Sequence, residues 1–120
     1  MTTDFKPIEA IGGDFSCGMM IVADHAMRHM PDEYGRLGLP DHEFDRHIAY
    51  DIGVEGVVRH LADLTGAPAV MARYSRLLLD PNRGEDDPTL VMRLYDGTII
   101  PANRHIDGAG VEERLERLYR

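Results

Sequence analysis

The sequence has one cysteine, no tryptophan and one lysine among its 120 residues. Cys17 has no second cysteine with which to form an intrachain disulfide, which fits a reducing compartment, so we expect a cytoplasmic protein. The N-terminal residues lack the basic start and the apolar run of a signal peptide. The longest apolar stretch, Met19–Ala23, is far too short to span a bilayer, so we expect no contact with a membrane.

Positive charge is also scarce. Asp and Glu number 21 against 13 Lys and Arg, a formal net charge of −8, and this field repels nucleic acid. All the basic residues except Lys6 are arginine, whose planar fork binds carboxylates. This composition suits a small anionic substrate, although genome composition explains it equally well.

The length and a hydrophobic content of 43% fit a single domain over residues 1–120. Apolar runs and turn residues predict short strands at Met19–Ala23, Ala69–Ala72, Leu77–Leu79 and Thr98–Ile100, the last after an Asp96–Gly97 turn. Helical periodicity predicts a long helix over His42–Leu64, with Asp41 as its N-cap, and a charged helix over Val111–Arg120. The order strand, helix, strand favours a parallel βαβ unit, so the predicted fold class is α/β.

Asp24 and His25 follow the first predicted strand. In open α/β sheets ligands collect at the carboxyl ends of strands, and an imidazole beside an acid suits zinc. An ordinary loop hydrogen bond made by His25 is the alternative. His29, four residues later, is expected to be a loop residue without a role in the site.

His47 and Asp51 are four residues apart, which places them on one face of the predicted helix, near the middle of its apolar arc. A carboxylate on such a face needs a partner. Either the two side chains hydrogen-bond to each other and only brace the helix, or they take part directly in a site.

A third cluster spans Arg73 to Arg83. Arg83 can clamp a carboxylate with two hydrogen bonds and Asn82 can add a neutral donor, with a surface salt bridge as the alternative role of Arg83. An unpaired carboxylate at a packed strand end is costly, so we expect Asp80 to orient Arg83 or Arg76. We also expect His25 to share one cavity with His47 and Asp51.

Six segments occur in the order typical of one family: Ala23–Ala26, Leu37–Pro40, Arg46–Gly53, Tyr74–Leu77, Asp80–Arg83 and Asp96–Asn103. Together they resemble the N-formylglutamate amidohydrolase family, from about Gly18 to Arg120. That family is similar to zinc carboxypeptidases and aspartoacylases. The resemblance implies a parallel or mixed sheet flanked by helices, a mononuclear zinc, and an Asn–Arg pair that binds the substrate carboxylate.

The resemblance also implies residue roles. The zinc ligands would be His25 and Asp51. The substrate would be bound by Arg76, Asn82 and Arg83. The residues that orient these side chains, without contacting the metal or the substrate themselves, would be Asp24, His47 and Asp80. The implied reaction is zinc-dependent hydrolysis of an N-formyl or N-acyl amino acid such as N-formylglutamate, since zinc lowers the pKa of its bound water and polarises the acyl carbonyl.

Two departures qualify this expectation. Met27 and Arg28 stand where the family usually has Ser or Gly followed by Asn, and Arg28 would bring positive charge near the metal. The family's later segment, with a further His ligand and the catalytic acid or base, has no counterpart before Arg120, so the chain resembles the N-terminal part and its catalytic residue stays unassigned. Two alternatives follow: a non-catalytic member that binds a small carboxylate, or a domain that forms homo-oligomers through sheet edges or the C-terminal helix.

Overall fold

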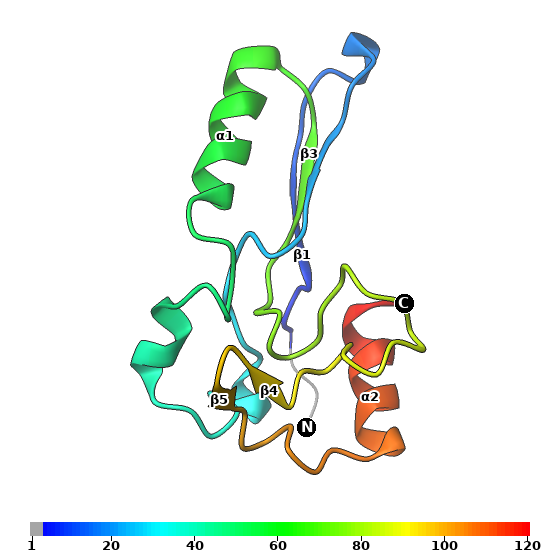
Figure 1. Ribbon diagram of the computed structural model, residues 1–120. Coiled ribbons are helices and arrows are strands. Elements are labelled where there is room, and N and C mark those ends of the chain that lie inside the picture. The colour runs from blue at the N-terminus through cyan, green and yellow to red at the C-terminus, as the bar shows by residue number, and fades with distance from the viewer. Residues whose placement is uncertain (1–3) are drawn as a thin grey trace.

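The computed structural model describes residues 4–120. The molecule is elongated, 46 × 27 × 27 Å, with one end formed by helix α1 on a sheet and the other by short turns, a hairpin and helix α2 (Figure 1). The helices are α1 (Val54–Thr65) and α2 (Gly108–Leu118), and the strands are β1 (Ile8–Ile11), β2 (Ile21–Ala23), β3 (Ala69–Ala72), β4 (Leu94–Tyr95) and β5 (Thr98–Ile99). Short 3-10 turns cover Phe15–Cys17, Asp32–Tyr34 and Asp41–Asp45.

The three-stranded sheet is mixed. Its order is β1-β3-β2, with β2 parallel to β3 and β1 antiparallel to it. The parallel βαβ unit β2-α1-β3 confirms the α/β class, and β3 has the expected bounds. Strand β1 was not predicted, because four residues that include Glu9 are too few to establish a period.

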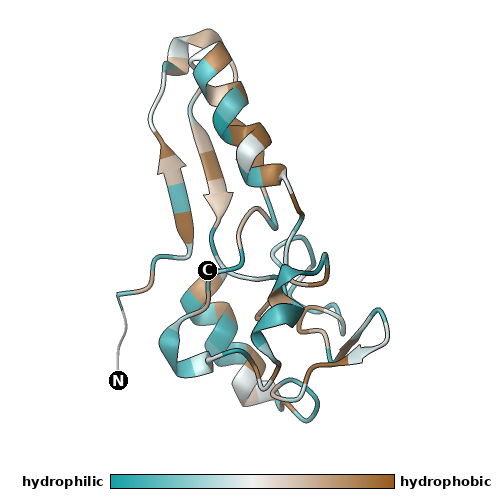
Figure 2. Cartoon of the chain, turned by 90° about the vertical axis from the view of Figure 1, so that its left-hand side faces the viewer, coloured by the Kyte–Doolittle hydropathy of each residue, from teal (hydrophilic) through white to brown (hydrophobic). Residues whose placement is uncertain are grey.

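Helix α1 lies against β2 and β3 and buries Val58 and Ala62 on them. Hydrophilic and hydrophobic residues are interspersed along α1, as expected of a helix with one buried face (Figure 2). No helix within residues 4–120 has the length and apolarity needed to cross a membrane.

The long helix expected over His42–Leu64 is wrong in its first half. Residues Asp41–Asp45 form a 3-10 turn, without a side-chain cap, and α1 begins only at Val54, after Gly53 in the left-handed region at φ 91°. Between them Ala49 is fully buried, and its carbonyl accepts hydrogen bonds from Arg76 N (3.2 Å) and Ser75 Oγ (2.8 Å). Tertiary hydrogen bonds therefore replace helical ones, and His47 and Asp51 do not share a helix face.

The strand expected at Leu77–Leu79 is also wrong. These three leucines are fully buried, but Leu77 and Leu78 lie in a turn and Leu79 follows it, and side chains satisfy two of their carbonyls. Asn103 Nδ2 donates to Leu77 O at 2.7 Å, and Arg114 Nη1 donates to Leu78 O at 2.8 Å. Because the backbone is satisfied in this way, no neighbouring strand is needed.

The hairpin β4-β5 turns at Asp96 (φ 47°) and Gly97 (φ 78°), as the Asp-Gly pair predicts. Helix α2 begins after Asp107, whose side chain accepts a hydrogen bond from Gly110 N at 2.8 Å. Its stripe buries Leu115 and Leu118 within the chain. The larger core cluster joins these leucines to Leu37, Phe44, Ile48, Ala49, Tyr74, Leu77, Leu78, Leu79, Leu90 and Ile100.

Candidate functional site

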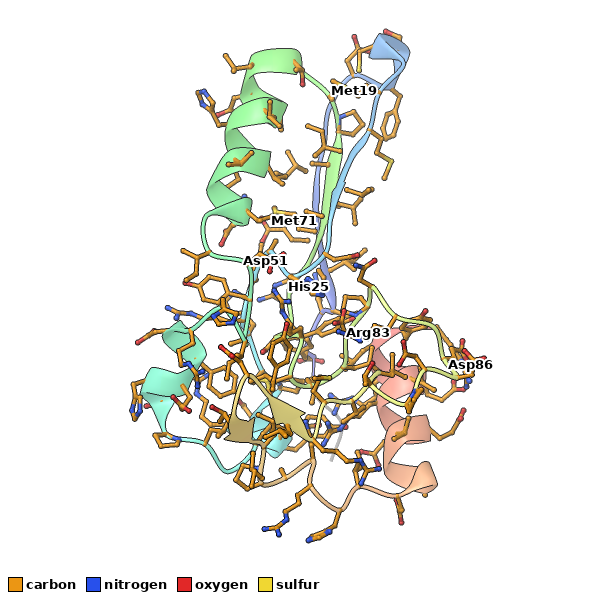
Figure 3. All side chains as sticks on the ribbon, in the orientation of Figure 1. Met19, His25, Asp51, Met71, Arg83 and Asp86 are labelled. Atoms are coloured by element: carbon orange, nitrogen blue, oxygen red, sulfur yellow. The ribbon has the colours of Figure 1, made fainter. Side chains whose placement is uncertain are left out.

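His25 lies at the junction between the two ends of the molecule, directly after β2 (Figure 3). Its backbone is in the left-handed region, φ 59°, which side-chain-bearing residues rarely adopt. The carbonyl of His25 accepts a hydrogen bond from Asp51 N at 2.7 Å, and the residue is only 8% exposed. The imidazole is thus held in a fixed, nearly buried position, with some local strain.

Asp80 contacts one side of this imidazole. Its Oδ1 is 2.6 Å from His25 Nε2 and accepts from Asn82 N at 2.9 Å, while its Oδ2 accepts from Arg83 Nε at 3.0 Å. The expected hydrogen bond between Asp80 and Arg83 is therefore present. Burial raises the pKa of Asp80, but the hydrogen bonds from His25, Asn82 and Arg83 outweigh it and lower this pKa to about 2.

An ionised Asp80 can only accept hydrogen bonds, so His25 carries its proton on Nε2. In the neutral imidazole the lone pair is then on Nδ1. This is the tautomer that a carboxylate imposes on metal-binding histidines.

Asp51 lies on the other side of the ring. Its Oδ2 is 3.4 Å from His25 Nδ1, and its side chain is 44% exposed. When His25 is neutral, two acceptors face each other across this gap, an arrangement that a cation stabilises. His25 Nδ1 and Asp51 thus suit a divalent metal, but no group of three His, Cys, Asp or Glu side chains within residues 4–120 is placed to hold one. The donor set is therefore partial.

Arg76 pairs with Asp51 and is itself 8% exposed. Its Nη1 hydrogen-bonds to Tyr95 OH at 3.1 Å. Its Nη2 forms the ion pair with Asp51 Oδ1, and its Nε has no hydrogen-bond acceptor within the described residues. A buried donor without an acceptor is costly, so Nε is the donor of Arg76 that remains unsatisfied.

Arg83 is held in place at three points. Besides the bond to Asp80, its Nη1 donates to Thr89 Oγ1, and its carbonyl accepts from Tyr119 OH at 2.9 Å. Asn82 precedes it in the same turn, which its backbone bond to Asp80 fixes. The loop therefore presents an oriented guanidinium on the same carboxylate that holds His25.

His47 is apart from this cluster. Its side chain is 61% exposed, Nε2 is 3.2 Å from Asp96 Oδ2, and the ring contacts Tyr95 edge-on. We expected His25 to share one cavity with His47 and Asp51. Asp51 lies beside His25, whereas the contacts of His47 are with Asp96 and Tyr95. Asp24 instead lines a small cavity of about 260 Å³ with Tyr74 and Tyr119.

Two further features were not expected. Tyr95 contacts Arg76 although the two are 19 residues apart. The one sequence signal for a role of Tyr95 is its position beside the Asp96–Gly97 turn. Arg28 does not contact His25: its guanidinium bonds to Phe44 O and Asp45 and lies over the Tyr50 ring.

Comparison with known proteins gives two findings. A family model described as N-formylglutamate amidohydrolase matches residues 17–120. The crystal structure of a gene product from Agrobacterium tumefaciens is similar, with a TM-score of 0.84 and 30% sequence identity over 96% of this chain. The match covers 46% of that protein, so this chain spans about half its length. No curated protein matches the chain.

Proposed function

The chain belongs to the N-formylglutamate amidohydrolase family, and from this premise we propose that it serves zinc-dependent hydrolysis of an N-formyl or N-acyl amino acid such as N-formylglutamate. The single observation that carries the proposal is the placement of His25 between two carboxylates. Asp80 is buried and strongly acidic, and Asp51 faces the free nitrogen across 3.4 Å.

His25 Nδ1 and Asp51 are the atoms that would hold the zinc. When bound, zinc supplies an acidic water and polarises a carbonyl. Catalytic zinc usually has three protein ligands, and the described residues offer two placed donors. Zinc binding by this chain is accordingly expected to be weak, with open positions for water or substrate.

The chain's own residues supply orientation and charge. Asp80 keeps the proton of His25 on Nε2, away from Asp51. Arg76 balances the charge of Asp51, and its Nε is left as a donor for an acyl oxygen or a carboxylate. Arg83, with Asn82, provides a second cation for the substrate α-carboxylate.

A second candidate function has an observation in its favour. Because no more than two metal donors are placed together within residues 4–120, the chain suits a non-catalytic family member that binds a small carboxylate through Arg76 and Arg83. A homo-oligomer would use the free edges of β1 and β2, near the exposed side chains of Ile8 and Val22.

The two functions are separable by experiment. Hydrolysis of N-formyl-L-glutamate with zinc is measured for the wild type, for His25→Gln and for the control His60→Gln, which alters an exposed histidine on α1. The hydrolase function is supported if the wild type turns over the substrate, His25→Gln abolishes this turnover and His60→Gln preserves it. Binding of N-formyl-L-glutamate without turnover, weakened by Arg83→Gln, supports the carboxylate-binding member. If the wild type shows no turnover and no binding of N-formyl-L-glutamate, both candidate functions are contradicted.

A further inference from the structure

A cavity away from the His25 cluster has a volume of about 880 Å³, within the range of small-molecule sites. It is lined by residues 28–32, 35 and 36, by residues 41, 42, 44 and 45 of the 3-10 turn Asp41–Asp45, and by Phe5 and Arg73. None of the residues of the His25 cluster lines it. The cavity is therefore a separate place for a ligand.

Three arginines of this cavity lie over aromatic rings. The guanidinium carbons are 4.9 to 5.3 Å from the ring centroids in the pairs Arg28–Tyr50, Arg36–Phe44 and Arg73–Phe5. Such contacts favour one orientation of each guanidinium. The donors that face the cavity are thus preoriented.

The three arginines differ in their charge partners. Arg28 is paired with Asp45 and Arg36 with Asp41. Arg73 donates to the Lys6 carbonyl at 3.0 Å and has no ion pair with a carboxylate within residues 4–120. Arg73 is therefore the guanidinium whose charge a ligand can still neutralise.

His29 lies beside Arg73 in the lining. Burial, and after it the charge of Arg73, lowers the pKa of His29, so near neutral pH the ring is uncharged and can donate one hydrogen bond. Met30 and Phe5, which are both partly exposed, add apolar surface, whereas Asp32 adds a carboxylate for which no hydrogen bond is present within residues 4–120. This carboxylate disfavours ligands with several negative charges.

We propose that this cavity binds a small organic monocarboxylate. Its carboxylate lies against Arg73 with His29 as a second donor, and its apolar body packs on Met30 and Phe5. Phosphate has the charge but lacks the apolar body, and Asp32 repels its second charge. The proposal is independent of the hydrolase reaction.

The test uses benzoate as the probe and the histidine side-chain NMR signals of the full chain as the readout. Benzoate is expected to shift His29 saturably and to raise its pKa, because a nearby negative charge stabilises the imidazolium. Inorganic phosphate is expected to bind at least about fivefold more weakly. Arg73→Gln should weaken benzoate about tenfold, as expected from loss of a charged hydrogen-bond partner, while Arg104→Gln, at an exposed position, should leave it unchanged.

The wild-type spectra decide the matter even if Arg73→Gln does not fold. A saturable shift of His29 with His25 unmoved supports the site. A shift of His25 alone would place benzoate at the His25 cluster and overturn the proposal, as would the absence of saturation or equal binding of phosphate and benzoate.

Discussion

The buried carboxylate of Asp80 holds His25, Asn82 and Arg83 at once, so Asp80→Asn is the most informative single change. The fall of its pKa from the ordinary value of 3.8 to about 2 measures how much folding favours the ionised form. At about 1.4 kcal/mol for each tenfold change in proton affinity, this is about 2 kcal/mol of unfolding free energy. Asparagine keeps the shape but loses the charge, so a loss of about this size is expected at pH 7.

The pH dependence of the unfolding free energy gives a second test of the contribution of Asp80. Because the pKa of Asp80 is lower in the folded state, its contribution is complete above about pH 4 and is lost as the pH falls toward 2. The difference in stability between the wild type and Asp80→Asn should therefore shrink over that window. Urea unfolding followed by far-UV circular dichroism measures it.

The control is Asp86→Asn, at an exposed position of the outer loop (Figure 3). This change should alter the unfolding free energy by no more than about 0.5 kcal/mol at any pH. Equal losses in the two variants, or a difference between wild type and Asp80→Asn that does not depend on pH, would refute the assignment of Asp80 as the ionised centre of the cluster.

Three further changes test the fold that positions the site. Gly53→Ala should destabilise the chain by about 1–2 kcal/mol because φ is 91°, whereas Gly56→Ala, inside α1 with open space around it, should stabilise it by about 0.5–1 kcal/mol; thermal melting of both variants checks the opposite signs. Asn103→Ala should cost about 3 kcal/mol, since it leaves the carbonyl of Leu77 and a donor of Arg114 without partners in the core. A melting temperature equal to that of the wild type would contradict this role of Asn103.

The parts of the fold that the sequence predicted are those set by neighbouring residues. Strand β3 was predicted with its bounds because Pro68 and Arg73 flank a short apolar run, and the hairpin because Asp96–Gly97 favours its turn. Asp80 and Arg83 are three residues apart, so their bond could be expected from local spacing.

The remaining errors come from contacts between distant segments. The helical pattern before Gly53 was misleading, because Ser75 and Arg76 donate hydrogen bonds to the carbonyl of Ala49, and Ile48 and Ala49 are buried in the core. His47 was placed in the site by that same pattern. The contact of Tyr95 with Arg76 joins a hairpin to a loop, and the position of Tyr95 beside the Asp96–Gly97 turn does not by itself predict Arg76 as its partner.

The central claim is that His25 Nδ1 and Asp51 bind zinc while Asp80 keeps the proton on His25 Nε2. A zinc titration followed by ¹⁵N NMR of the histidine rings tests it most directly. The account predicts that zinc shifts His25 Nδ1, that Nε2 stays protonated, and that Asp51→Asn weakens binding about tenfold, in line with loss of one metal ligand. An unmoved His25 Nδ1, or zinc bound through Nε2, would contradict it.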